Sequence, residues 1–250
     1  MFRRLASVAV TLVLFGCAAH PVDVDRNVAP GHIAVQEGKP GTVVAAPHAT
    51  SDPRTGDIAA ELARRTGFGL VVASGSAVEA DAREAPGRRY QGNRPFEGVP
   101  GRPASQEIAS DAARRVYEAY EQGVREAAQG PLAFYVEIHG NNRREAAGRI
   151  EVATVGVDRD DALQLRTLLE LVRDAHLRSH PAAPRLQALV EPADPVVYAA
   201  SGAKRLGILR PPERALHFEL PRVARIDWRE LYTVILADFL RQAVTLPIAS

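Results

Sequence analysis

Short apolar runs alternate with amphipathic stretches along the chain, and this alternation predicts an α/β fold. The run 41–47 is rich in small and β-branched residues and ends at His48, which predicts a buried strand. Apolar residues then recur at helical spacing over 57–67, where a glycine would end the helix. The short run 70–73 predicts a second strand.

The same alternation continues towards the C-terminal end. Strands that alternate with helices predict a three-layer α/β domain with a largely parallel sheet. The stretch 82–103 is rich in Arg, Gly and Pro and predicts a long loop, which in a compact domain is more often functional than idle. The further predicted elements are a helix at 105–128, strands at 132–139 and 150–157, a helix at 160–177, strands at 186–190 and 215–220, and a helix at 228–244.

The first 17 residues have the layout of a bacterial export signal. Arg3 and Arg4 precede a weakly polar to apolar stretch that is too short to be a good membrane span. The sequence Leu14-Phe15-Gly16-Cys17 resembles the lipobox at which bacterial lipoproteins are cleaved and acylated. We therefore expect an exported, periplasmic or cell-envelope protein with an N-terminal lipid on Cys17. The alternative is a plain secretory signal with an incidental cysteine.

The chain divides into three parts. Residues 1–17 form the signal, and residues 18–40, with three prolines and no apolar periodicity, predict a tether and the entry to the domain. Residues 41–250 form one domain. The whole chain of 250 residues, with 46% hydrophobic and 24% charged residues, has the length and composition of an ordinary globular protein with one sizeable core.

Charge and cysteine content narrow the possible partners and ligands. Removal of the signal takes away Arg3 and Arg4 and no acidic residue, which changes the formal net charge from +1 to −1. This balance gives no reason to expect nucleic acid as a partner. Because Cys17 is the single cysteine, the folded domain has no disulfide of its own, and any metal must be held by His and carboxylate side chains.

Polar side chains stand at the ends of three predicted strands, at His48, His139 and Glu219. In open α/β sheets, ligand sites collect beyond the carboxyl ends of the strands. Side chains alternate along a strand, so Glu137 shares a face with His139, and His217 shares one with Glu219. Two strands therefore deliver polar groups at the same end of the sheet.

These side chains suit a hydrolytic zinc site. Such a site needs about three His or carboxylate ligands, an open position for water, and a nearby group that takes a proton from that water. Asp52 follows His48 by four residues, close enough for a turn to bring both onto one metal ion with His139. Glu219 supplies the proton acceptor.

Four motifs occur together in a recognisable order. The chain resembles the N-formylglutamate amidohydrolases and related zinc carboxypeptidase-like deacylases over roughly residues 41–225. The motifs that carry this resemblance are Pro47-His48-Ala-Thr-Ser-Asp52-Pro53, Asn93-Arg94-Pro95, Glu137-Ile-His139-Gly140 and His217-Phe-Glu219-Leu-Pro-Arg222.

The resemblance implies a three-layer phosphorylase/hydrolase-like fold with a mixed, largely parallel sheet. It implies a Zn²⁺-dependent enzyme that hydrolyses an amide bond of a small N-acyl amino acid or peptide next to a free carboxylate. The implied roles are metal binding for His48, Asp52 and His139, general base for Glu219, and binding of the substrate carboxylate for Asn93 and Arg94.

Several positions have a structural alternative. Glu219 could form an ion pair with Arg222 or Arg225, and a buried carboxylate needs a partner or a use. Glu137 could orient His139 or pair with a nearby arginine. For the whole chain, the alternative is a non-catalytic envelope lipoprotein that uses the same fold to bind a peptide or cell-wall fragment.

Overall fold

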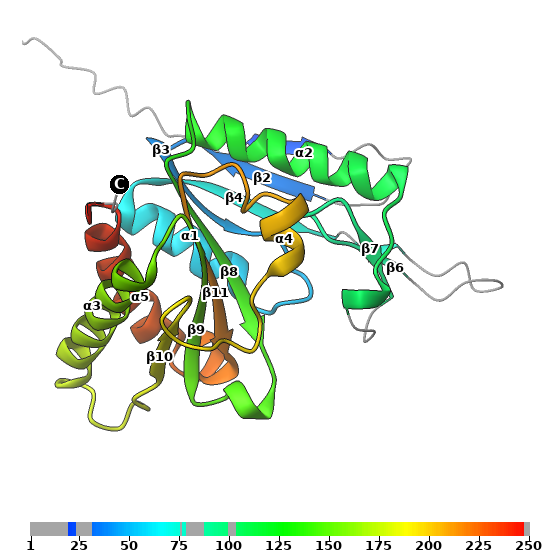
Figure 1. Ribbon diagram of the computed structural model, residues 1–250. Coiled ribbons are helices and arrows are strands. Elements are labelled where there is room, and N and C mark those ends of the chain that lie inside the picture. The colour runs from blue at the N-terminus through cyan, green and yellow to red at the C-terminus, as the bar shows by residue number, and fades with distance from the viewer. Residues whose placement is uncertain (1–19, 24–31, 76, 79–87, 100–103, 248–250) are drawn as a thin grey trace, which may run out of the picture.

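A mixed eight-stranded sheet forms the centre of the molecule (Figure 1). The computed structural model describes residues 20–23, 32–75, 77–78, 88–99 and 104–247. In spatial order the strands are β1 (His20–Asp23), β2 (His32–Gln36), β4 (Phe68–Ser74), β3 (Lys39–Ala46), β8 (Phe134–Asn141), β11 (Arg214–Pro221), β9 (Arg149–Val155) and β10 (Gln187–Val190). The run from β4 through β3 and β8 to β11 is parallel, as is the pair of β9 and β10. The remaining neighbours are antiparallel.

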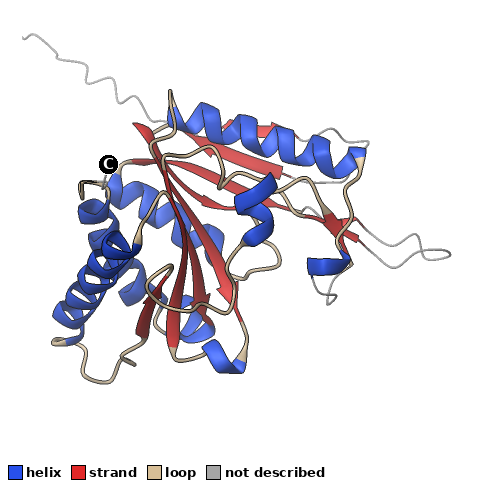
Figure 2. Ribbon diagram, viewed as in Figure 1, coloured by secondary structure: helices blue, strands red, loops and turns tan. Residues whose placement is uncertain are grey.

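Helices cover both faces of the sheet, as Figure 2 shows. One face packs against α1 (Thr55–Thr66), α3 (Arg159–Leu177) and α5 (Arg229–Ala243). The other packs against α2 (Asp111–Ala128) and the short α4 (Ser201–Leu206). The predicted three-layer α/β class with a mixed, mostly parallel sheet is thereby confirmed. Short 3₁₀ turns lie at Ala104–Gln106 and Arg144–Ala146, and a π-helical turn lies at Val223–Asp227.

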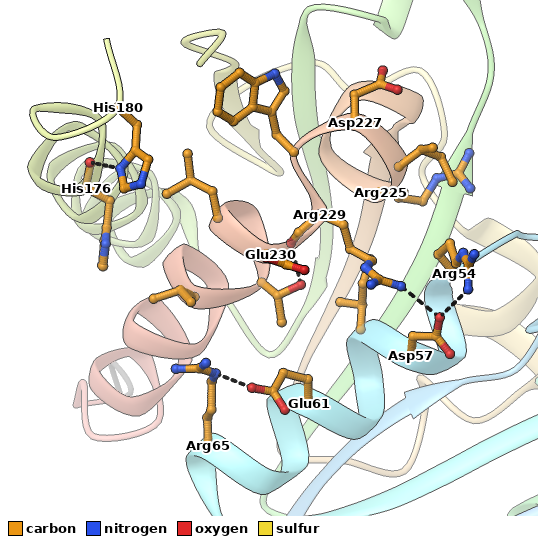
Figure 3. Close-up of a pocket in the computed structure, with 16 residues that line it drawn as sticks. Arg54, Asp57, Glu61, Arg65, His176, His180, Arg225, Asp227, Arg229 and Glu230 are labelled. Carbon is orange, nitrogen blue, oxygen red and sulfur yellow. Dashed lines mark hydrogen bonds and ion pairs between the residues drawn. The ribbon is translucent and has the colours of Figure 1, made fainter. Parts of the chain in front are cut away.

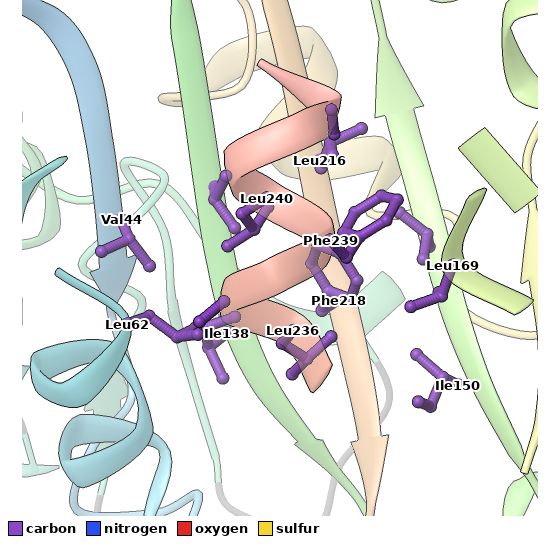
Figure 4. Packing of buried hydrophobic residues seen from close by; sticks show 14 of the residues in the cluster. Val44, Leu62, Ile138, Ile150, Leu169, Leu216, Phe218, Leu236, Phe239 and Leu240 are labelled. Atoms are coloured by element: carbon purple, nitrogen blue, oxygen red, sulfur yellow. The ribbon is translucent and has the colours of Figure 1, made fainter. Parts of the chain in front are cut away.

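Alternation along the central strands separates an apolar face from one that carries polar side chains. Ile138 of β8 and Phe218 of β11 lie in the core beneath α5 (Figure 4). Phe218 meets Phe239 of α5 edge to face, with ring centroids 6.1 Å apart. Successive residues of a strand point to opposite faces. His139 and Glu219, the residues that follow these two, are therefore directed away from this core.

The N-terminal boundary of the domain differs from the prediction. Residues 18–40 were expected to form a tether, yet they contain β1, β2 and the start of β3. Ile33 and Val35 of β2 are each only 2% exposed, because both pack beneath α2. Residues 1–17, with Cys17, lie outside the described residues. Within the described part, no helix is long and apolar enough to cross a membrane.

The predicted loop 82–103 contributes two of the three strands of a small second sheet. The strands of this sheet are β5 (Ala77–Val78), β6 (Arg88–Tyr90) and β7 (Glu97–Gly98), while residues 79–87 and 100–103 lie outside the described part. The turn between β6 and β7 closes by a hydrogen bond from the Gln91 backbone N–H to the Phe96 carbonyl oxygen, at 2.9 Å. This turn carries Asn93 and Arg94, and both are buried.

Candidate metal centre

Three of the predicted residues meet in one cluster. His48 follows β3, Asp52 ends the turn after it, and His139 stands near the end of β8. The Nδ1 atoms of His48 and His139 lie 3.9 and 3.5 Å from Oδ2 of Asp52. One potential ligand atom from each residue falls within 4.8 Å of the others. The predicted ligand set is therefore assembled by the fold.

The cluster fits a metal ion such as zinc. Two imidazoles and one carboxylate form a donor set that zinc uses in hydrolytic enzymes. His48 also has a buried Nε2 with no hydrogen-bond partner in the described part of the chain. Buried polar atoms are normally paired, so this imidazole is one that a ligand would satisfy.

Burial and neighbouring charges shift the pKa values of the three residues in different directions. Burial, together with the charge of His139, lowers the pKa of His48 well below its ordinary value, which favours the neutral imidazole that binds metals. Burial opposes ionisation of Asp52, but hydrogen bonding and attraction to His139 lower its pKa to about 2. Burial likewise opposes protonation of His139, but Asp52 and Glu137 raise its pKa to about 10.

Glu137 is the centre of a buried hydrogen-bond network next to the candidate metal ligands His48, Asp52 and His139. Its Oε1 accepts from the Tyr135 hydroxyl at 3.1 Å, and its Oε2 accepts from Asn93 Nδ2 at 3.2 Å. Oε2 also lies 3.1 Å from His139 Nε2 and 2.9 Å from His217 Nδ1. Burial alone would raise the pKa of Glu137, but the bonds from His139 and His217 hold it far below its usual value.

An ionised carboxylate only accepts hydrogen bonds. His139 Nε2 and His217 Nδ1, which face Glu137, must therefore each donate a hydrogen bond to it. His139 then has its Nδ1 available on the side of Asp52, where a metal would lie. A second possible metal group, formed by Glu137, His139 and His217, is less suitable, because four donors already saturate Glu137. Of the two roles considered for Glu137, the structure supports the orientation of His139.

Glu137→Gln should destabilise the protein by on the order of 3 kcal/mol, because it removes a buried charge that four donors surround. Chemical denaturation without added zinc would measure the loss. Glu118→Gln is the matched control, since Glu118 is 56% exposed on α2 and should tolerate the change. Equal stability of both variants would mean that the network contributes little.

Glu219 lies next to the candidate metal ligands, on β11, the neighbour of the strand β8 that carries His139. It pairs with His139 in the register of β11 and β8, and it is 8% exposed. Its Oε1 is 3.3 Å from His217 Nε2. Within the described part of the chain it forms no ion pair with an arginine.

The two arginines considered as partners of Glu219 have other contacts. Arg222 is exposed and lies 3.9 Å from Asp227. Arg225 is buried, and its guanidinium donates to the Leu220 carbonyl, the Pro53 carbonyl and Asn142 Oδ1. The interpretation of Glu219 as half of a structural ion pair is therefore not supported.

Asn93 and Arg94, predicted to bind the substrate carboxylate, lie at the edge of the same network. Arg94 Nη1 donates to Asn93 Oδ1 at 3.1 Å, and Asn93 in turn donates to Glu137. The other two guanidinium nitrogens of Arg94, Nε and Nη2, donate to Glu107. The fold thus brings this pair to the site, but with protein partners in place.

Neither the family models nor the curated proteins that we searched match this chain. Among solved structures, a bacteriophage poly-gamma-glutamate hydrolase is similar at 12% identity, over 85% of this chain and 87% of that one, with a TM-score of 0.44. Thrombin activatable fibrinolysis inhibitor is similar at 10% identity, over 92% and 70%, with a TM-score of 0.44. An aspartoacylase family protein from Mesorhizobium loti is similar at 13% identity, over 88% and 62%, with a TM-score of 0.39. Similarities this weak leave the function to be argued from the residues of the site.

Sequence analysis did not identify two residues that border the site. Tyr198, from the connection after β10, lies over His217 with ring centroids 5.7 Å apart. Glu107, from the connection before α2, contacts Arg94. Both stand in irregular segments without a periodic pattern, so no sequence signal placed them there. His217, which was expected to share a face with Glu219, stacks its ring on that of His139 with centroids 4.1 Å apart.

A wide groove also runs between α1, α5 and the end of α3 (Figure 3). None of the predicted ligand or base residues lines it. Asp57 is paired with Arg54 and Arg229, each at 3.0 Å. His176, near its rim, is bonded to Asp238 at 2.8 Å. Asp57 and His176 are thus already engaged with protein partners, and the predicted ligand and base residues lie at the strand ends instead.

Proposed function

We propose that this chain is a zinc-dependent hydrolase that cleaves an amide bond next to a free carboxylate. The observation that carries the proposal is the position of Glu219, next to the His48, Asp52 and His139 cluster and without an arginine partner in the described residues. A metal centre with a neighbouring carboxylate that is free to exchange protons is the arrangement that metal-assisted hydrolysis needs.

His48, Asp52 and His139 would hold the ion. When bound, zinc supplies a Lewis acid that polarises a carbonyl group and makes water more acidic. Glu219 accepts a proton from the attacking water, whose oxygen forms the new bond to the carbonyl carbon. The carbon–nitrogen bond then breaks as Glu219 passes that proton to the leaving amine. Glu137 keeps the His139 ring in one orientation throughout, because it holds Nε2.

We assign the substrate carboxylate to Arg94, with Asn93 beside it. The planar guanidinium fork makes paired, charge-assisted hydrogen bonds to a carboxylate. The contact with Glu107 supports this assignment, since the same fork already accommodates one carboxylate. N-acyl amino acids and peptides with a free C-terminus both present such a group next to an amide bond.

Zinc content and a substrate screen test the proposal. Purified protein should bind about one equivalent of zinc. It should also hydrolyse N-formyl or N-acetyl amino acids, or short peptides, with a preference for a free over an amidated carboxyl group. Far less than one equivalent after zinc supplementation would instead favour a non-catalytic binding protein.

We further propose that the protein acts in the cell envelope, held by a lipid on Cys17. Cys17→Ser should still permit export but abolish lipid attachment, because only that thiol can accept a diacylglyceryl group at the cleavage site. Detergent-phase partitioning of cell extracts measures the difference, with Ala18→Ser as the neighbouring control. Recovery of Cys17→Ser in the detergent phase would show that something else anchors the protein.

A further inference from the structure

The carboxylate of Glu107 is bound by the guanidinium group of Arg94. Nε and Nη2 of Arg94 donate to the two carboxylate oxygens of Glu107 at 3.0 and 2.7 Å. The two side chains are only 7% and 12% exposed. Paired, charge-assisted bonds of this kind are among the stronger hydrogen bonds in proteins. A substrate carboxylate that binds this side of the guanidinium would need these same two donors.

Arg94 has little freedom to meet a substrate elsewhere. Its third donor group, Nη1, is bonded to Asn93. Its stem packs against Gly202 of α4, where even a Cβ atom would lie 3.0 Å from Arg94 Cδ. The guanidinium group of Arg94 is therefore held in place. Another carboxylate can bind its Nε and Nη2 only if the Glu107 carboxylate moves away.

Glu107 is built differently, with a fixed backbone and a side chain that has several rotatable bonds. The neighbouring residue Ile108 exchanges two backbone hydrogen bonds with Glu97, each 2.9 Å long. Gly98 lies against this side chain, since a Cβ there would be only 3.1 Å from Glu107 Cγ, so the glycine is what allows Glu107 to reach Arg94 at this point. Rotation of the side chain alone would withdraw the carboxylate without disturbing the strand pairing.

We propose that Glu107 is a specificity-determining residue, which occupies the carboxylate subsite on Arg94 until a substrate carboxylate replaces it. This inference rests on the proposed function, which assigns that subsite to Arg94. A buried guanidinium without a partner is costly, so Arg94 exchanges one carboxylate for another. A neutral ligand cannot offer that exchange, and the pair of Arg94 and Glu107 therefore selects for ligands that carry a carboxylate.

Two probes that differ only at the carboxyl group test this directly. N-acetylglycine and N-acetylglycinamide are titrated into the metal-free protein by calorimetry, so that neither zinc binding nor turnover enters the measurement. Glu107→Gln removes the competing charge and should tighten N-acetylglycine binding by about tenfold or more. Binding of N-acetylglycinamide should stay within about twofold. The exposed Glu118→Gln variant controls for the change in net charge.

Glu107→Asp provides a second test should the glutamine variant fold poorly. It keeps the charge but shortens the reach to Arg94, so N-acetylglycine should bind it with intermediate affinity. The proposal is overturned if neither variant binds N-acetylglycine more tightly than wild type, or if no variant binds it at all. If the proposed function is wrong, the protein will bind no zinc or hydrolyse no substrate. The titrations use metal-free protein and measure binding alone, so they can be interpreted in either case.

Discussion

Glu219→Gln should slow hydrolysis by about a hundred- to ten-thousand-fold, the contribution typical of a positioned acid–base group. The amide keeps the size of the side chain and can still hydrogen-bond, but it cannot take a proton from the attacking water. Because Glu219 is not among the proposed metal ligands, zinc content should stay near the wild-type value. Melting temperature should also change little, since no arginine in the described part of the chain would lose a partner. Turnover, zinc content and melting temperature are measured on one sample.

Glu213→Gln is the matched control, because Glu213 directly precedes β11 and is exposed. It undergoes the same chemical change near the same strand, so any effect of lost charge alone would appear in both variants. Preserved turnover in Glu219→Gln would contradict the mechanism. A large loss of stability with residual activity intact would instead identify Glu219 as a structural residue.

His139→Ala and His48→Ala should each weaken zinc binding by more than about a hundredfold. Loss of a residue that merely orients a ligand typically costs ten- to a hundredfold in metal affinity, and loss of the ligand itself removes a bond as well. His139→Ala should have the larger effect, because it also leaves Glu137 without one of its buried donors. Competition with a chelator of known affinity gives both values.

His180→Ala is the control for nonspecific zinc binding by histidine. This residue is exposed near the end of α3, away from the cluster. Its replacement should leave zinc affinity within about twofold of wild type. Full zinc occupancy of either His48→Ala or His139→Ala under the same competition would move the metal site elsewhere.

The residues at the strand ends could be located from sequence because alternation carries strong information. Apolar residues at every second position of β8 and β11 face one core, which fixes the face of the residues between them. His139 and Glu219 were therefore predicted to lie at the same end of the sheet, and the structure pairs them in the register of β11 and β8. Asp52 was harder to predict, because a His and an acid four residues apart are common in turns.

Other features gave no signal that a single sequence can provide. β2 is five residues long and follows a proline-containing stretch, so its alternation of Ile33 and Val35 was too short to outweigh the tether interpretation. The contact of Glu107 with Arg94 joins two irregular segments whose positions depend on tertiary packing. The antiparallel placement of β11 beside β9 likewise depends on how the whole sheet is assembled.

The site draws its parts from two kinds of backbone. His139 and Glu219 stand on central strands that pair along their length, whereas Arg94 and Glu107 stand on connections between elements. Strands in the core of a sheet tolerate little change, while connections accept substitution and altered length. Substitutions in the connections could therefore change which ligand is recognised, while His139 and Glu219, the proposed metal ligand and base, keep their positions in the strand register.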